Sequence, residues 1–484
     1  MELEPHLTQL FINNKFVDCR SSKKVSVFNP ASGDLVSDQI PVAGDEDINE
    51  AVRFANEAFQ PDSPWRKMTN AARQKILLRF ADLLEANQER LGYLTRLTLG
   101  APYLPFGKAE IATAIDYAGW IDKFAGQTFP ADDGYYKIVR NEPIGVVAGI
   151  IPWNGPLASV GLKAAPALAT GNVFILKPSE KTPLMAAELG KLVVEAGFPP
   201  GVFQVLTGDG TTGAALASHM RVAKVSFTGS IETGKTVQVL AAKSNLKRVT
   251  LELGGKSPAV VFNDANLKNA VECTTNALLT NSGQICFAAT RLYVQAGIYD
   301  EFVEAYKKTF KAKESVIGDP ERPGTEIGPV VDKAQFERIM NIITTAKDEQ
   351  QGTLIAGGKP IGSKGYYIEP TIFTNTKDSA TIYKDEIFGP VVVINKFDSE
   401  EEIIRRSNDS KYGLMAGVFT QDISRALRMS SALDSGVVGI NCISTISFSC
   451  PFGGTKESGL GREMGEHALR AYTEPKTVLI NLNY

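Results

Sequence analysis

Between residues 145 and 262 the sequence alternates short apolar runs with helical stretches, and this rhythm constrains the fold more than any other feature. The apolar runs have the length and composition of buried parallel strands. They lie at residues 145–153, 173–176, 203–206, 224–228, 248–253 and 259–262. Between them, Pro183 in a first turn and Gly197 as a stop predict a helix over 182–196. Strands that alternate with helices predict a doubly wound parallel sheet, which binds ligands at the carboxyl ends of its strands.

The rest of the chain predicts further α/β structure. Strands are expected at 24–28 and 35–40, and a helix is expected behind the acidic residues 45–47. Residues 286–450 repeat the strand–helix rhythm and predict a second α/β unit. A chain of 484 residues has room for about three domains, or for two with an elaboration.

Composition argues against several classes of function. Lys and Arg total 51 against 54 Asp and Glu, so no global charge attracts nucleic acid or an anionic membrane. The chain has only three histidines, and two of them lie near its ends, which argues against a histidine-built zinc site or a Ser-His-Asp triad. Its five cysteines form no CxxC pair, so neither a bound metal nor a disulfide framework is expected. No signal peptide or membrane span is recognisable, and a cytoplasmic protein is expected.

A literal G-x-G-x-x-G at residues 208–213 has two interpretations. It follows a predicted strand and precedes a predicted helix, as a dinucleotide-binding fingerprint does. It also fits an ordinary strand-to-helix loop, in which glycines make tight turns.

Three single residues also have a functional and a structural interpretation. Cys286, in Asn281-Ser282-Gly283-Gln284-Ile285-Cys286, is a nucleophile if it ionises and otherwise a small buried hydrophobe. Glu252, at the end of a strand beside two glycines, is a general base or a surface carboxylate. Asn154, between two prolines, is a donor to an oxyanion or a turn former.

Together, these motifs resemble the NAD(P)-dependent aldehyde dehydrogenase superfamily from about residue 8 to the end of the chain. In chain order the matching motifs are Pro152-Trp153-Asn154, Lys177-Pro178-Ser179-Glu180, Phe227-Thr228-Gly229-Ser230, Glu252-Leu253-Gly254-Gly255-Lys256, Gly283-Gln284-Ile285-Cys286, Glu386-Ile387-Phe388-Gly389-Pro390 and Pro451-Phe452-Gly453-Gly454. The resemblance implies a Rossmann-type cofactor domain (1–123 and 144–253) and an α/β catalytic domain (254–456). It also implies a small β arm for oligomerisation (124–143 and 470–484) in a homodimer or homotetramer.

The resemblance assigns catalytic roles to five residues. Cys286 is expected to attack the aldehyde carbon, while Asn154 and the Cys286 N–H stabilise the oxyanion of the thiohemiacetal. After hydride transfer to NAD, Glu252 is expected to activate the water that hydrolyses the thioester. Lys163 and Glu463 match a proton path behind Glu252.

The resemblance also assigns the coenzyme contacts. Glu386 is expected to bind the nicotinamide ribose, Lys177 and Glu180 the adenosine ribose, and Ser230 the pyrophosphate. The full set is Ile151, Pro152, Trp153, Lys177, Ser179, Glu180, Thr228, Gly229, Ser230, Leu253, Glu386 and Phe388. Glu180 favours NAD over NADP, because a carboxylate accepts a ribose hydroxyl and repels a 2′-phosphate. In the family the phosphate contact is made by the turn at residues 229–234, so the resemblance favours the interpretation of residues 208–213 as a structural loop.

Departures from the family pattern point to the substrate. Gly155 stands where many relatives carry an aromatic residue after Trp-Asn, which widens the expected tunnel there. The residues expected to line this tunnel are Gly155, Ile285, Phe287, Cys442, Phe448 and Phe452. They predict a hydrophobic or aromatic aldehyde rather than a small charged one. Ala289 stands where a glycine is frequent, without a functional interpretation.

Two other functions remain to be distinguished. An acylating relative would pass the acyl group to coenzyme A, although such relatives replace the carboxylate at Glu252. A binding protein that kept the fold without turnover would have no need of Cys286, Glu252 and Asn154 together.

Overall fold

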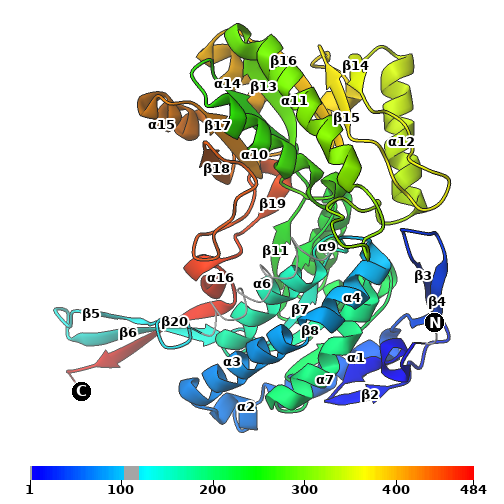
Figure 1. Cartoon of the computed structure of the whole chain (residues 1–484). Coiled ribbons are helices and arrows are strands. Elements are labelled where there is room, and N and C mark those ends of the chain that lie inside the picture. Colours follow the sequence, from blue (N-terminus) through cyan, green and yellow to red (C-terminus); the bar gives the residue numbers. More distant parts are fainter. Residues whose placement is uncertain (1–2, 103–118, 484) are drawn as a thin grey trace.

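The computed structural model describes residues 3–102 and 119–483, and the strands within these ranges form four sheets (Figure 1). The largest sheet has the order β19-β11-β10-β7-β8-β9-β1-β2. Its parallel centre consists of β7 (Val146–Ile150), β8 (Val173–Lys177), β9 (Phe203–Val205), β10 (Lys224–Thr228) and β11 (Arg248–Glu252). Its antiparallel margins are β1 (Leu10–Ile12), β2 (Lys15–Val17) and β19 (Gly459–Leu460). The predicted doubly wound sheet is confirmed.

The first sheet reverses its strand order at β7. The chain runs outward from β7 through β8 and β9, and then returns to add β10 and β11 on the other side. A crevice opens at such a reversal, beyond the carboxyl ends of the strands. β7 is shorter than the predicted strand, so residues 151–154 form a loop at this crevice.

Helices pack on this sheet because β7 and most of β8 are apolar on both faces. α7 (Pro183–Ala196) begins and ends as predicted, with Gly197 at φ +91° as its left-handed stop. The other helices of this half are α1 (Asp45–Ala58), α2 (Pro64–Lys67), α3 (Asn70–Ala86), α4 (Gln88–Leu99), α6 (Pro156–Ala169), α8 (Gly210–Ser218), α9 (Ile231–Lys243) and α16 (Gly465–Ala471). Phe174 and Phe203 meet at the centre of the core, with ring centroids 5.6 Å apart.

The second sheet has the order β14-β15-β16-β13-β12-β17-β18. Its strands are β12 (Ser257–Val261), β13 (Ala289–Gln295), β14 (Thr353–Ala356), β15 (Thr371–Thr374), β16 (Val391–Phe397), β17 (Met415–Phe419) and β18 (Val437–Ile440). Its helices are α10 (Leu267–Leu279), α11 (Tyr299–Lys313), α12 (Lys333–Asp348), α13 (Thr381–Lys384), α14 (Glu400–Asn408) and α15 (Ile423–Ala432). The alternation of strands and helices predicts that residues 259–262 belong to the first sheet. This prediction is wrong, because β12 pairs with β13 and β17 of the second sheet.

A third sheet projects from the body as an arm (Figure 1). It pairs β6 (Tyr135–Pro143) with β5 (Gln127–Phe129) on one side and with β20 (Thr473–Asn481) on the other. The fourth sheet pairs the two predicted strands β3 (Lys24–Phe28) and β4 (Leu35–Pro41) in antiparallel fashion. The boundaries of the three predicted domains stay predictions, and residues 103–118 of the first domain lie outside the described residues.

In the described part of the chain, no helix has both the length and the apolar character of a membrane span.

Candidate active site

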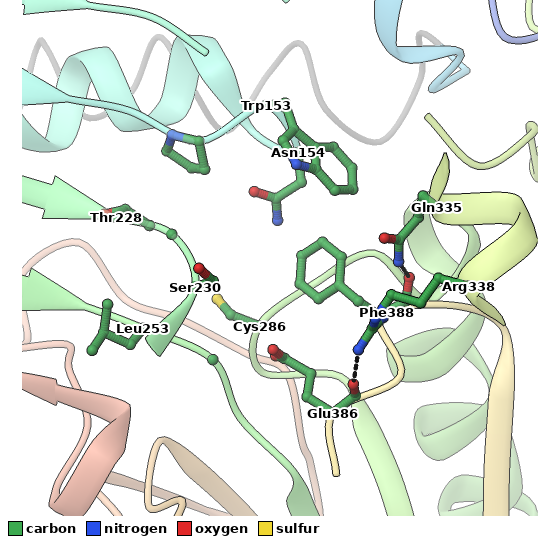
Figure 2. Close-up of a pocket in the computed structure, with 13 residues that line it drawn as sticks. Trp153, Asn154, Thr228, Ser230, Leu253, Cys286, Gln335, Arg338, Glu386 and Phe388 are labelled. Carbon is green, nitrogen blue, oxygen red and sulfur yellow. Dashed lines mark hydrogen bonds between the residues drawn. The ribbon is translucent and has the colours of Figure 1, made fainter. Parts of the chain in front are cut away.

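A cavity of about 280 Å³ lies where the loops after β7 and β10 face the second sheet (Figure 2). It receives side chains from both halves of the molecule. Its lining consists of Pro152, Trp153, Asn154, Thr228, Gly229, Ser230, Leu253, Gly254, Cys286, Gln335, Arg338, Glu386 and Phe388. Figure 2 shows the Cys286 sulfur and the Asn154 amide at this cavity, as the sequence predicts.

The loop that leads to Cys286 has an unusual backbone. Asn281, Ser282 and Gly283 are all left-handed, with φ of 50°, 56° and 74°. Left-handed backbone is uncommon for residues other than glycine and persists only where surrounding contacts enforce it. Ser282 Oγ donates a hydrogen bond of 2.6 Å to the Gly328 oxygen, and Gln284 Oε1 accepts one of 2.9 Å from the Val331 N–H. The motif therefore places Cys286 on a tightly held turn.

Asn154 is joined to the same turn from the opposite side. Its Nδ2 donates to the main-chain oxygen of Gln284 at 2.9 Å, and Asn281 Nδ2 donates to the Asn154 oxygen at 3.0 Å. A carboxamide has two N–H donors, so one donor of Asn154 fixes its position and the other is available to a ligand.

Cys286 is a neutral thiol in this arrangement. Burial raises the pKa of the Cys286 thiol, and the carboxylates of Glu386 and Glu252 raise it further. A thiolate therefore needs either a positive charge brought by a ligand or removal of the proton by a base.

Glu386 and Phe388 close the cavity on the side of the second sheet. Glu386 Oε1 accepts a hydrogen bond of 2.9 Å from the Gly255 N–H, while burial raises the pKa of this carboxyl to about 7. A Cβ on Gly254 would lie 2.3 Å from Glu386 Oε2, so a glycine is required for this approach. Phe388 meets Trp153 edge-on, with ring centroids 5.2 Å apart.

Two residues that the sequence analysis missed hold this segment. Gln335 Nε2 donates to the Phe388 oxygen at 2.9 Å, and Arg338 donates to the oxygens of Ile387 and Glu386 at 2.6 and 2.7 Å. Both side chains line the cavity from α12. No local motif marked them, because their role arises from the packing of α12 beside residues 386–388.

A second cavity of about 300 Å³ extends along the first sheet and shares Pro152, Trp153 and residues 228–230 with the first. Ile151, Lys177, Ser179 and Glu180 line it, so every predicted coenzyme residue lies at one of the two cavities. Lys177 Nζ lies 3.5 Å from Glu180 Oε2, and burial lowers the pKa of Lys177.

The ends of two helices face the second cavity. Ser230 caps α9, and its Oγ accepts a hydrogen bond of 3.3 Å from the Thr233 N–H. The interpretation of residues 208–213 as a structural loop stays a prediction. α8 begins inside this motif at Gly210, and both Gly210 and Gly213 line the cavity.

Glu252, Lys163 and Glu463 lie together, but not at either cavity. Lys163 Nζ is ion-paired with Glu463 Oε1, and both side chains are buried. Glu252 Oε2 is buried without a hydrogen-bond partner. Burial raises the pKa of Glu252 well above its ordinary value, and the neighbouring Glu463 carboxylate raises it further. The predicted general base and proton path thus form one buried polar group behind the cavity wall.

The six predicted tunnel residues line neither cavity. Phe287 meets Phe452 edge-on at 5.6 Å, and Phe448 packs into the same apolar cluster. Leu162, which the sequence analysis missed, joins this cluster from α6. A Cβ built on Gly155 meets no atom within 4 Å, so open space lies beside it. Ile285 and Cys442 are half-buried.

A separate ionic group lies near the amino-terminal end. Glu4, His6 and Glu188 bring possible metal-ligating atoms within 4.8 Å of one another. Arg90 and Lys191 contact both of these carboxylates. Because two cations already neutralise the group, it is an ion-pair network rather than a site for a further cation.

Comparison with known proteins gives one consistent result. Residues 16–478 match the model of the aldehyde dehydrogenase family. The chain is 46% identical over 487 residues to human aldehyde dehydrogenase 1A1, which covers 100% of this chain and 96% of the relative. The NAD⁺ complex of an aldehyde dehydrogenase from Bacillus cereus superposes with a TM-score of 0.95 at 42% identity, covering 100% and 99% of the two chains. The P. syringae indole-3-acetaldehyde dehydrogenase AldA, solved with NAD⁺ and IAA, gives 0.96 at 37% identity, covering 100% and 97%.

Proposed function

The chain belongs to the aldehyde dehydrogenase family, and on that basis we propose that it oxidises a hydrophobic or aromatic aldehyde to the carboxylic acid with NAD. One observation carries the proposal. The Cys286 thiol and the Asn154 amide face one cavity, and that cavity continues into a second one that extends along the first sheet.

The residues of both cavities fit a dinucleotide. Thr228 Oγ1 is buried without a hydrogen-bond partner at the wall that the cavities share. The amino-terminal end of α9 offers free N–H groups and a positive dipole to a pyrophosphate. Glu180 and Lys177 then face the adenosine ribose, and the Glu180 carboxylate favours NAD over NADP.

Catalysis begins at Cys286 in this proposal. A base first takes the thiol proton, and the sulfur then bonds to the aldehyde carbon. The resulting oxyanion accepts hydrogen bonds from the free Asn154 N–H and from the Cys286 N–H. NAD, when bound, supplies the acceptor for the hydride that this carbon loses, which leaves a thioester on Cys286.

Hydrolysis of the thioester is assigned to Glu252. Burial raises the pKa of the Glu252 carboxyl, which makes its carboxylate a stronger base than an ordinary one. Lys163 and Glu463 lie next to it and provide the first step of a proton path.

The substrate class rests on the apolar surroundings of Phe287. Phe287, Phe448, Phe452 and Leu162 belong to one cluster, and Gly155 leaves space beside the loop that carries Asn154. The P. syringae relative named for indole-3-acetaldehyde, an aromatic substrate, agrees with this assignment.

The arm is the proposed site of self-association as a homodimer or homotetramer. Leu479 and Ile480 on β20 and Phe129 on β5 are exposed apolar side chains on it. A cytoplasmic location is proposed because all five cysteines are free thiols, as in a reducing compartment.

A panel of aldehydes with NAD and with NADP tests the proposal. Benzaldehyde-like substrates should give a higher kcat/KM than succinic semialdehyde, and NAD should be preferred. The acid should form without coenzyme A, whereas formation of acyl-coenzyme A alone would contradict the role of Glu252. Cys286→Ala should abolish NADH formation and still bind NAD, and unchanged turnover in this variant would refute the covalent mechanism.

A further inference from the structure

The first sheet carries a line of polar side chains on a face where apolar ones are normal. Side chains alternate between the two faces of a strand, so Lys224, Ser226 and Thr228 share one face of β10. β11 lies in register beside it and adds Thr250, opposite Ser226, and Glu252, opposite Thr228. Such a face in a parallel sheet is normally covered by apolar packing, so these side chains require an explanation.

These side chains are connected by hydrogen bonds. Lys224 Nζ donates to Thr250 Oγ1 at 3.0 Å, and Thr250 Oγ1 donates to Ser226 Oγ at 3.1 Å. Ser226 Oγ donates to Glu463 Oε1 at 3.4 Å and accepts from Lys163 Nζ at 3.2 Å. We name the series Lys224–Thr250–Ser226–Glu463 the polar file.

The polar file runs from the neighbourhood of the buried Glu252 to the amino-terminal end of β10. Its Glu463 end lies beside Glu252, behind the wall of the cavity. Lys224 lies four residues before Thr228, the residue opposite Glu252, and this is about 13 Å along the strand. There Lys224 lies next to Arg248, whose partly exposed side chain pairs with Glu474.

We propose that the polar file carries the proton that Glu252 takes from water during thioester hydrolysis, and that Lys224 is its terminal proton carrier. This proposal rests on the proposed function. It assigns a function to Lys224, Ser226 and Thr250, although none of them lines either cavity.

The step balances as follows. The oxygen of water bonds to the thioester carbon, and the C–S bond breaks with its electron pair on the Cys286 sulfur. One proton of that water goes to Glu252, and the other stays on the acid until it ionises. Glu252 Oε2 has no hydrogen-bond partner in this structure, so the protonated carboxyl first turns to Glu463 and passes the proton to it. The Ser226 and Thr250 hydroxyls then turn so that Glu463 donates to Ser226, Ser226 to Thr250 and Thr250 to Lys224. Transfer along these bonds leaves the proton on Lys224 as an ammonium and restores the donors seen in the structure. A hydroxyl group can do this because it donates one hydrogen bond while it accepts another.

The surroundings of Lys224 suit a group that gains and loses a proton. Burial lowers the pKa of Lys224 to about 7, with further lowering by Lys163 and Arg248 and an opposing effect of Glu463. The Tyr472 ring lies 4.8 Å from Nζ and favours the ammonium form. Arg462 is a further charge that acts on Glu252.

Pre-steady-state kinetics of the full-length enzyme with NAD and benzaldehyde test the polar file. The first turnover of NADH reports acylation, and the following steady state reports hydrolysis. Thr250→Val should leave the first turnover unchanged and slow the steady state about tenfold, whereas Thr250→Ser, which restores the hydroxyl, should recover it. Thr274→Val, which removes a buried hydroxyl bonded within α10, should resemble the wild type.

The pH profile separates a proton carrier from a structural lysine. Because a neutral Lys224 is the acceptor, the wild-type hydrolysis rate should rise as the pH rises through about 7. Lys224→Met and Lys224→Arg should both remove this rise, because arginine keeps the charge without releasing a proton. Recovery of the wild-type profile by Lys224→Arg, or equal rates in Thr250→Val and Thr250→Ser, would overturn the proposal. Absence of any aldehyde-dependent NADH in the wild type would instead refute the proposed function.

Discussion

The side-chain amide of Asn154 donates a hydrogen bond of 2.9 Å to the main-chain oxygen of Gln284, two residues before Cys286. This bond joins the loop after β7 in the first sheet to the turn that precedes β13 in the second. The distance between the oxyanion donor and the nucleophile is therefore set by a direct contact between the two halves of the molecule.

Asn154→Ala should lower kcat/KM for aldehyde oxidation about 100-fold, because it removes both the oxyanion donor and this contact. NADH formation over a range of aldehyde concentrations measures the effect. Asn281→Ala, which keeps the Asn154 amide and removes the bonds from Asn281 Nδ2 to the Asn154 and Gln284 oxygens, should give a smaller loss. An equal loss in both variants would mean that Asn154 acts only by holding the turn.

Gly283→Ala should inactivate the enzyme without unfolding it. Gly283 has φ +74°, and a Cβ there would lie 2.2 Å from the Gly389 oxygen, so the turn before Cys286 has to move away from the segment that carries Glu386. A displacement of about 1 Å at a nucleophile costs on the order of 100-fold in rate. Steady-state kinetics and a thermal melt of the same sample distinguish misplacement of Cys286 from loss of the fold.

Coenzyme binding should depend on pH through Glu386. Its pKa is raised to about 7, so the carboxyl is mostly neutral at pH 6 and mostly ionised at pH 8. Only the carboxylate accepts two hydroxyl hydrogen bonds, so NAD affinity should rise with pH across this range, by at most about tenfold per pH unit for one proton. Fluorescence titration of Glu386→Gln should give a weak affinity that changes little with pH. A pH dependence equal to that of the wild type would assign it to another group.

The pair formed by Lys181 and Asp332 should slow release of the coenzyme. Lys181 lines the second cavity from the loop after β8, and its Nζ lies 2.7 Å from Asp332 Oδ2 at the start of α12, so the pair spans the gap between the two halves. Both side chains are 29% exposed, and such a pair contributes about 0.5–1 kcal/mol. Lys181→Ala should therefore release NADH roughly two- to fivefold faster in a stopped-flow displacement assay.

Asp332→Asn is the matched variant for this pair, because an amide still accepts the hydrogen bond of 2.8 Å from the Gln335 N–H that caps α12. It should speed release as much as Lys181→Ala, and the double variant should be no faster than either single one. Additive effects would show that the two residues act separately.

Gly155→Phe should change substrate choice. A Cβ built on Gly155 meets no atom within 4 Å, so a larger side chain has room at this position. It should raise KM for a benzaldehyde-like substrate about tenfold and leave KM for acetaldehyde nearly unchanged, because a methyl group needs less room. An equal change for both substrates would place the aldehyde elsewhere.

Local sequence patterns predicted the elements of the first sheet well. The buried runs near β8 and β10 and the Pro183 and Gly197 boundaries of α7 are properties of a few adjacent residues. The sheet to which β12 belongs could not be read in the same way. Its apolar run is equally suited to either sheet, and its partners β13 and β17 are distant in sequence.

The site shows the same limit. Short motifs identified Cys286, Asn154 and the coenzyme loops, because each combines a chemical group with a turn. The roles of Gln335 and Arg338 depend on α12 packing beside residues 386–388, and no pattern within α12 reveals that contact. Lys224 and Thr250 likewise look like ordinary strand residues until β10 and β11 are placed in register.

The arm has a consequence for biosynthesis. β6 pairs with β20 along nine residues, yet about 330 residues of chain separate the two strands. During translation β6 therefore has only the short β5 as a partner until β20 emerges, and its other edge stays open. Open strand edges on incomplete chains promote aggregation, so crowded or rapid expression should reduce the soluble yield. Charged substitutions on the exposed positions of β6 offer a way to protect the nascent chain.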